Sequence, residues 1–203
     1  MLYNIIQTST SMTEEINQAL PEKYIAIRDA TQASGFTMAS DIVTCSLLRT
    51  LAASKPVGKF LELGTGTGLS TSWILNGMDT DSTLISIDHD HHFLDIATRF
   101  LGNDTRLKLI TTDGEEWVNN NKEQKFDYIF ADTWHGKYLL LYEVLSMLNK
   151  GGLYIIDDML PQENWPDGHH QKAIDLVKYL NTRNDLVLTK QCWATGIVIA
   201  VKK

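Results

Sequence analysis

The sequence has few cysteines and no excess of positive charge. Cys45 and Cys192 are the only cysteines among 203 residues, and they lie far apart and outside any C-x-x-C pattern. A disulfide framework or a thiolate metal site therefore has little support. Lys and Arg number 18 against 25 Asp and Glu, for a net charge of -7, and no basic block stands out. Because nucleic-acid binding requires basic side chains that neutralise phosphates, we expect no nucleic-acid partner.

Long apolar runs are also missing. No stretch approaches the ~20 residues that a membrane-spanning helix needs, and the first residues lack the basic leader and apolar core of a signal sequence. We therefore expect a cytoplasmic protein with no membrane partner. With 43% hydrophobic and 21% charged residues, the chain suits a single domain over 1–203, in which a helical segment, 1–55, precedes the core, 56–203.

From residue 59 onward, short strand-like runs alternate with helix-like segments. The predicted strands are 59–63, 83–88, 107–111, 126–131 and 153–156, and the predicted helices are 69–77, 91–101, 114–120, 136–149 and 168–183. This alternation predicts an α/β fold with a doubly wound, mostly parallel sheet. Two closely spaced runs, 186–189 and 196–201, add an antiparallel C-terminal hairpin at the sheet edge and bring the total to seven strands. Extra N-terminal helices are expected after Ser11, after Pro21 and over 41–53.

Residues 62–68, with the sequence Glu-Leu-Gly-Thr-Gly-Thr-Gly, are the most informative stretch. Three alternate glycines directly after a strand leave the backbone bare where a ligand approaches closely, which predicts a nucleotide-like cofactor. The spacing differs from the G-x-G-x-x-G of dinucleotide-binding proteins. Glu62 would repel a pyrophosphate but suits a cationic amino acid tail. A tight strand-to-helix turn without a ligand is the alternative.

Acidic residues follow each of the next predicted strands. Because ligands collect at the carboxyl ends of parallel strands, these acids are expected to lie together. Asp88, 24 residues after Gly64, is placed to accept both hydroxyls of a ribose, and His89 to flank an adenine. Asp113 is placed to accept the adenine amino group. Each acid taken alone is also a candidate helix cap.

The glycine-rich loop resembles motif I of the class I S-adenosylmethionine-dependent methyltransferases, which have a Rossmann-like fold. Residues 132–138, Asp-Thr-Trp-His-Gly-Lys-Tyr, resemble the segment D-x-x-K-x-x-Y of the catechol and caffeoyl-CoA type O-methyltransferases. The resemblance implies S-adenosyl-L-methionine as cofactor and methyl transfer to a hydroxyl of a small, perhaps aromatic, acceptor. The residues expected to bind the cofactor are Glu62, Gly64, Thr65, Gly66, Ser70, Asp88, His89, Asp113, Gly114 and Asp132.

The same resemblance implies a metal ion and a general base. Asp132 and Asp157 match metal ligands of the family, and Asp158 stands where the family usually has Asn. Three carboxylates form an oxygen-rich site of the kind that Mg²⁺ or Ca²⁺ prefers. His135 stands where the family has Lys, and with an unperturbed pKa of about 6.5 it is the predicted catalytic base. Two alternatives stay open: the acids bind no metal, and His135 is a solvated residue at a helix start.

Other functions also stay open. They are a metal-independent methyltransferase acting on an amine or carboxylate, an aminopropyltransferase, and a non-catalytic cofactor-binding protein, while the glycine spacing argues against a dehydrogenase. A homodimer is suggested by the resemblance and by the apolar residues 2–6. Residues expected to shape the acceptor site are Phe36, Met38, Trp165 and Trp193.

Overall fold

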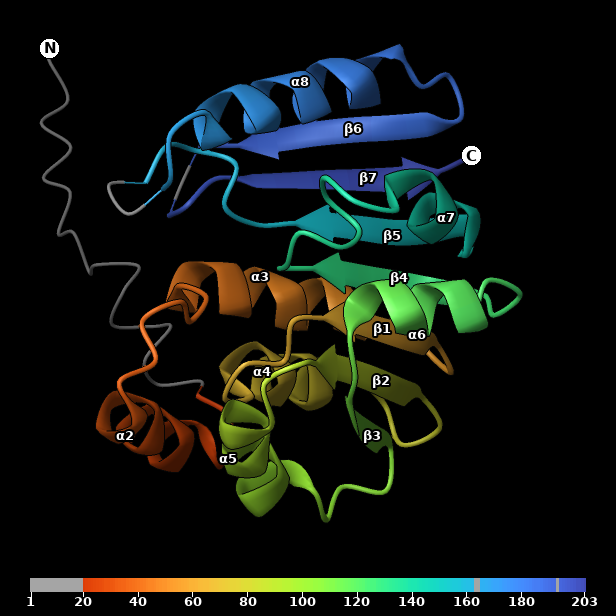
Figure 1. Cartoon of the computed structure of the whole chain (residues 1–203). Coiled ribbons are helices and arrows are strands. Elements are labelled where there is room, and N and C mark those ends of the chain that lie inside the picture. The colour runs from red at the N-terminus through yellow and green to blue at the C-terminus, as the bar shows by residue number, and fades with distance from the viewer. Residues whose placement is uncertain (1–19, 163–164, 193) are drawn as a thin grey trace, which may run out of the picture.

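A seven-stranded sheet forms the centre of the computed structural model, which describes residues 20–162, 165–192 and 194–203. The strands are β1 (Lys59–Leu63), β2 (Thr83–Asp88), β3 (Leu107–Thr111), β4 (Phe126–Ala131), β5 (Leu148–Ile156), β6 (Leu186–Gln191) and β7 (Ile197–Lys202). Their order is β3-β2-β1-β4-β5-β7-β6 (Figure 1). Strands β1 to β5 run parallel, and β7 pairs antiparallel with both β5 and β6. The predicted fold class and the edge hairpin are confirmed.

Helices cover both faces of the sheet. One layer contains α2 (Tyr24–Ser34), α3 (Ile42–Ala53), α4 (Leu69–Gly77) and α5 (His91–Leu101), and the other contains α6 (Gly114–Asn120), α7 (Leu141–Ser146) and α8 (His169–Thr182). Within the described residues, no helix is both long and apolar enough to cross a membrane.

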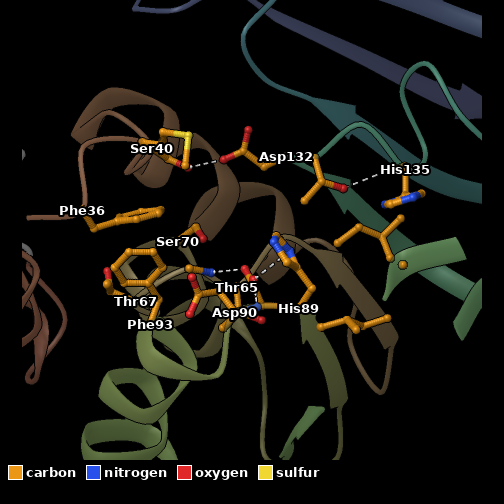
Figure 2. A pocket seen from close by; sticks show the side chains of 18 of the residues that line it. Phe36, Ser40, Thr65, Thr67, Ser70, His89, Asp90, Phe93, Asp132 and His135 are labelled. Atoms are coloured by element: carbon orange, nitrogen blue, oxygen red, sulfur yellow. Dashed lines mark hydrogen bonds and ion pairs between the residues drawn. The ribbon is translucent and has the colours of Figure 1, made fainter. Parts of the chain in front are cut away.

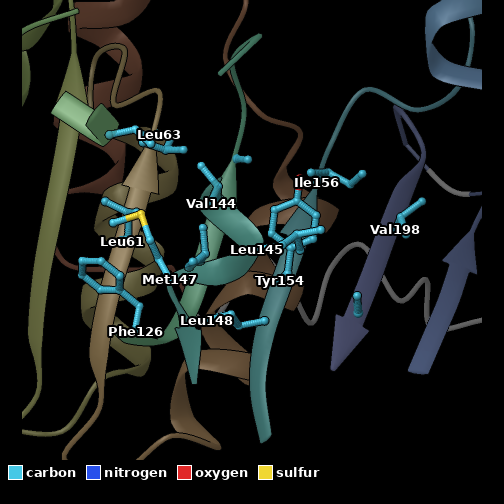
Figure 3. Close-up of a cluster of buried hydrophobic side chains, with 14 of the residues drawn as sticks. Leu61, Leu63, Phe126, Val144, Leu145, Met147, Leu148, Tyr154, Ile156 and Val198 are labelled. Atoms are coloured by element: carbon cyan, nitrogen blue, oxygen red, sulfur yellow. The ribbon is translucent and has the colours of Figure 1, made fainter. Parts of the chain in front are cut away.

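Alternation along the strands divides the apolar side chains between two cores. In β4, Tyr128 and Phe130 pack under α3 and α4, whereas Ile129 and Ala131 pack with α6, α7 and α8. The second of these clusters, which includes Tyr154 of β5, is drawn in Figure 3. Burial on both faces is typical of a parallel sheet between helical layers.

Most predicted boundaries agree with the observed elements. Strands β1 to β4 and helices α4, α5 and α6 begin and end where the sequence predicted. Asp41 caps α3, because its side chain accepts a hydrogen bond of 2.7 Å from the backbone N–H of Val43. The helix predicted after Ser11 and the apolar residues 2–6 lie outside the described residues.

The helix predicted over 136–149 is wrong. Only Leu141–Ser146 are helical, and residues 148–152 belong to β5, which the prediction made too short. Two residues ahead of α7 adopt left-handed backbone conformations, Gly136 with φ 84° and Leu140 with φ 55°. The hydroxyl of Tyr154 donates a hydrogen bond to the carbonyl of Gly136 and ties this segment to β5. Residues 132–140 therefore form a loop that begins at the carboxyl end of β4.

Candidate functional site

A cavity of about 510 Å³ lies at the carboxyl ends of β1, β2 and β4 (Figure 2). Its volume is in the usual range of small-molecule sites, and ligands of open α/β sheets bind at this edge. Every residue predicted to bind the cofactor lines the cavity, with the exception of Glu62. The lining comes from residues 36–40, the glycine-rich loop, and the segments that follow β2, β3 and β4.

The glycine-rich loop needs its glycines for backbone conformation. Gly64, Gly66 and Gly68 have φ values of 106°, 51° and 89°. Residues other than glycine rarely adopt these backbone conformations. The N–H groups of Gly64 and Thr65 donate to the carbonyl of Ile87 at 2.9 and 3.1 Å. The loop is thereby held across the end of β2, with its backbone facing the cavity.

Glu62 lies behind the loop rather than in the cavity. Its side chain is fully buried and accepts hydrogen bonds from Ser70 at 2.6 Å, Thr71 at 2.6 Å and Ser86 at 2.5 Å. Burial raises the pKa of Glu62 to about 7, although these hydroxyl groups act in the opposite direction. Of its three partners, only Ser70 lines the cavity. Glu62 therefore connects the first turn of α4 to β1 and β2.

Asp88 joins the end of β2 to the glycine-rich loop. Its Oδ2 accepts the N–H of Gly66 at 2.7 Å, and its Oδ1 accepts the N–H of Asp90 at 2.9 Å. These two bonds hold the carboxylate at the cavity wall. Nδ1 of His89 also lies 3.5 Å from Oδ1. A carboxylate has about four acceptor positions, so at least one remains for the ribose hydroxyls that the sequence predicted.

The predicted adenine end is formed by the start of α6 and by His135. Asp113 accepts the N–H groups of Glu116 and Glu115 at 3.1 and 2.8 Å, and these bonds lower the pKa of its carboxyl group. A Cβ at Gly114 would lie 2.6 Å from Nδ1 of His135. Gly114 is thus the residue that lets the imidazole pack against this turn. The Asp132 and His135 side chains point apart (Figure 2).

An aromatic pair that sequence reasoning missed closes the other side of the cavity. The rings of Phe36 and Phe93 lie 4.6 Å apart between centroids, and both residues line the cavity. Phe36 was expected near the acceptor, whereas Phe93 was not singled out. Its position in the first turn of α5, five residues after Asp88, is the only signal that the sequence offered.

Asp132 forms hydrogen bonds with one group from a distant part of the chain and with one from the loop that follows it. Its Oδ2 accepts the hydroxyl of Ser40 at 3.0 Å, and its Oδ1 accepts Nζ of Lys137 at 3.3 Å. The same Nζ lies 3.8 Å from Oδ2 of Asp158. Only 5% of the Lys137 side chain is exposed. No role was predicted for Lys137 from the sequence. It lies five residues after Asp132, whereas the lysine of the family motif lies three residues after the aspartate.

The charges of this cluster affect one another. Burial raises the pKa of Asp132, and the nearby Lys137 ammonium acts in the opposite direction. Burial also lowers the pKa of Lys137, but the charges of Asp132 and Asp158 outweigh this and the net pKa is raised. Lys137 is therefore an ammonium at neutral pH.

Asp157 is held away from the Lys137 contact by its own partners. It accepts hydrogen bonds from the hydroxyl of Thr195 and, at 2.8 Å, from the backbone N–H of Asp158. Burial raises the pKa of its carboxyl group. Asp158 has a φ of 56°, a left-handed conformation that Asp and Asn tolerate better than most residues.

The arrangement does not fit the predicted divalent cation. Among residues 20–162, 165–192 and 194–203, no three His, Cys, Asp or Glu side chains are grouped as metal ligands. The Lys137 ammonium contacts two of the three acids that were predicted to hold the ion. A metal at Asp132, Asp157 and Asp158 stays a prediction from the sequence.

A second cavity of about 410 Å³ adjoins the first through Trp134, which lines both. Its lining includes Lys137 and Tyr138, and Nζ of Lys172 lies 4.1 Å from the centre of the Trp134 ring. The His169 ring packs 5.1 Å from Tyr138 and 4.4 Å from Trp165, which was expected near the acceptor. The other candidate, Trp193, lies outside the described residues.

The sheet order, the glycine-rich loop and the acids at the strand ends define a Rossmann-like fold with a nucleoside-type cavity. Residues 61–159 match the family described as a methyltransferase domain. The resemblance to the S-adenosylmethionine-dependent methyltransferases of the catechol and caffeoyl-CoA type is thereby confirmed, and the chain carries a methyltransferase domain.

Three relatives illustrate the similarity. Catechol O-methyltransferase B of Danio rerio is 30% identical over 112 residues, which cover 50% of this chain and 42% of that protein. Probable caffeoyl-CoA O-methyltransferase 1 of Dictyostelium discoideum is 24% identical over 187 residues, which cover 88% of this chain and 76% of that protein. The structure of an O-methyltransferase from Bacillus cereus in complex with SAH superposes with a TM-score of 0.81 at 16% identity, covering 94% of this chain and 96% of that chain.

These matches differ in the share of each protein that they cover and in sequence identity. The chain spans 39% of the length of the first curated relatives, which are O-methyltransferases of Mycobacterium leprae. The structural similarity, at less than 25% identity, shows the fold. The activity of the whole protein and the identity of its acceptor therefore do not follow from these matches.

Proposed function

We propose that the protein is an S-adenosyl-L-methionine-dependent O-methyltransferase that methylates a hydroxyl group of a small molecule, with aromatic molecules among the candidates. The observation that carries this proposal is the cavity at the strand ends, where the glycine-rich loop, Asp88 and Gly114 line one space. Their order matches the methionine, ribose and adenine parts of the cofactor. The names of the curated relatives support the choice of oxygen as the acceptor atom.

The chemistry needs a nucleophilic oxygen in line with the methyl group. The acceptor oxygen forms a bond to the methyl carbon while the carbon–sulfur bond breaks, and its electron pair stays on sulfur. The hydroxyl proton passes to a base, for which the sequence predicts His135. Holding the two reactants in this geometry supplies most of the acceleration.

The position of His135 supports a second role. Its ring packs on Gly114 and lines the cavity beside the predicted adenine site. We propose that it contributes to cofactor binding, and its role as base stays a prediction that a pH-rate profile tests.

Calorimetry tests the cofactor first. We expect the protein to bind S-adenosylmethionine and its demethylated product, and not NAD. Absence of binding to the first two would reject the proposal. A panel of catechols, other phenols, amines and carboxylates, assayed with S-adenosylmethionine, then separates O-methylation from the alternatives. Methylation of amines or carboxylates alone would favour the metal-independent alternative enzyme, and binding without any turnover would favour a non-catalytic cofactor-binding protein.

Two further proposals rest on the sequence. A cytoplasmic location and a homodimer are proposed from the sequence and from the family resemblance, and size-exclusion chromatography with light scattering tests the dimer. Mg²⁺ or Ca²⁺ assistance through Asp132, Asp157 and Asp158 stays a prediction from the family motif. The contacts of Lys137 argue for a different cation at that place.

A further inference from the structure

We propose that the ammonium group of Lys137 is the permanent cation of the acceptor site, and that it takes the place of the divalent metal ion that the family motif implies. The inference rests on the proposed function, because it concerns how that reaction holds its acceptor. It extends the function to a residue at a variable position of the motif and predicts a reaction that needs no metal ion.

Lys137 forms ion pairs with two acids, Asp132 and Asp158. Nζ of Lys137 lies 3.3 Å from Oδ1 of Asp132 and 3.8 Å from Oδ2 of Asp158. Only 5% of the Lys137 side chain and 12% of the Asp132 side chain are exposed. A buried charge needs partners of opposite sign, and here each group supplies one for the other.

The positive charge of Lys137 repels a divalent cation from these acids. A divalent cation bound to a carboxylate oxygen lies about 2.0–2.6 Å from it. An ion on Oδ1 of Asp132 would therefore lie within about 6 Å of Nζ of Lys137, given the 3.3 Å between Nζ and Oδ1. Asp157, the third predicted ligand, already accepts hydrogen bonds from Thr195 and from the backbone of Asp158. Asp132 and Asp157 thus accept hydrogen bonds from groups of the protein itself, and Asp158 has the Lys137 ammonium 3.8 Å away.

Backbone contacts fix the course of the loop that carries Lys137. The chain folds back after β4, and the N–H groups of Lys137 and Tyr138 donate to the carbonyl of Trp134 at 3.2 and 2.9 Å. The hydroxyl of Tyr154 binds the carbonyl of Gly136, the residue just before Lys137. These contacts direct the lysine side chain toward Asp132 and bury it.

The ion pair of Asp132 and Lys137 lies between the two cavities. Asp132 lines the cofactor cavity and Lys137 lines the second cavity, so their ion pair lies where the two spaces adjoin. An ammonium group has three N–H donors. One is donated to Oδ1 of Asp132 at 3.3 Å, whereas Oδ2 of Asp158, at 3.8 Å, is within ion-pair distance only. A remaining donor is available to the acceptor oxygen, which carries negative charge as it attacks the methyl group.

Titration with Mn²⁺, followed by the electron paramagnetic resonance of the free ion, tests the inference without any turnover. The variants are Lys137→Met, which removes the charge at similar length, and Lys178→Met as a control. Lys178 pairs with Asp175 on the surface of α8, with 70% of its side chain exposed. All proteins are saturated with the demethylated cofactor product.

We expect wild type and Lys178→Met to bind no stoichiometric Mn²⁺, and Lys137→Met to gain a site at least tenfold tighter than any in wild type. A stoichiometric site in the wild-type protein would overturn the inference. So would a Lys137→Met protein that gains no affinity, because the lysine would not then be what excludes the ion. If Lys137→Met does not fold, Lys137→Gln makes the same comparison.

Turnover supplies a second readout. We expect wild-type kcat/KM for the acceptor to be unchanged by EDTA, and Lys137→Met to lose at least a hundredfold while its cofactor Kd changes less than threefold. Loss of wild-type activity in EDTA that Mg²⁺ restores would overturn the inference. Failure of the wild type to bind S-adenosylmethionine would instead reject the proposed function, so the two failures are distinguishable.

Discussion

The backbone N–H of Gly66 donates a 2.7 Å hydrogen bond to Oδ2 of Asp88. This bond connects the loop after β1 to the end of β2, and it holds a carboxylate where the proposed cofactor places its ribose. The same residue therefore shapes the glycine-rich loop and offers acceptors to a ligand.

Asp88→Asn should weaken cofactor binding. The amide keeps one acceptor oxygen but loses the charge that strengthens hydrogen bonds from hydroxyl groups, which contribute about 1.5–3 kcal/mol when one partner is charged. We expect the Kd for S-adenosylmethionine to rise at least tenfold in calorimetry. Asp95→Asn, on the exposed face of α5, is the matched control, and equal affinities for the two variants would contradict a role for Asp88.

Glu62 should make the protein less stable as pH rises. Its folded pKa of about 7 exceeds the ordinary value of 4.5, so the folded state binds more protons between these two values. The stabilisation is complete below pH 4.5 and is lost as pH rises through the folded pKa, up to about 3 kcal/mol. Thermal melts from pH 5 to 8 measure this dependence.

Glu62→Gln should flatten that pH dependence, because an amide does not ionise. Some dependence should remain, since burial also raises the pKa of Asp132. Glu123→Gln, which changes an exposed residue, should melt with the same pH dependence as wild type. A Glu62→Gln protein with the wild-type slope would show that this carboxylate is ionised throughout.

Gly66→Ala should cost more than a glycine substitution at a comparable φ elsewhere. A Cβ at Gly66 would lie 2.9 Å from the ζ carbon of Phe36, whereas a Cβ at Gly151, with φ 77°, would meet nothing within 4 Å. Gly151→Ala therefore measures backbone strain alone, about 1 kcal/mol in urea unfolding. We expect Gly66→Ala to lose about 2 kcal/mol and to weaken cofactor binding. Equal losses in the two variants would mean that Phe36 moves aside freely.

His135→Gln should distinguish cofactor binding from base catalysis. Because the ring packs on Gly114, we expect the KM for S-adenosylmethionine to rise several-fold while the pH dependence of kcat stays unchanged. A base would act in its neutral form, so activity would fall on the acidic side of the pH profile. Loss of that acidic limb in His135→Gln, with an unchanged KM, would identify His135 as the base.

The elements that the sequence predicted well are those in which local signals agree. Strand β2 is a short apolar run, and α5 follows it behind a cap, Asp90, whose side chain accepts the N–H of His92. The prediction of a helix over 136–149 failed because the apolar spacing of this segment is helical, whereas Gly136 and Leu140 adopt left-handed backbone conformations and Gly136 is tied to β5 by the Tyr154 hydroxyl. Spacing in sequence carries no information about such a contact.

For the candidate site, the sequence by itself determined which residues lie at the strand ends. Acids that close parallel strands meet at one edge, because the sheet brings those ends together, and the glycine spacing indicates a cofactor of the S-adenosylmethionine type. Tertiary structure alone decided what each side chain contacts. It placed Glu62 behind the loop, because three hydroxyl groups from α4 and β2 surround it, and it brought Lys137 to Asp132 through a loop whose course no local pattern encodes.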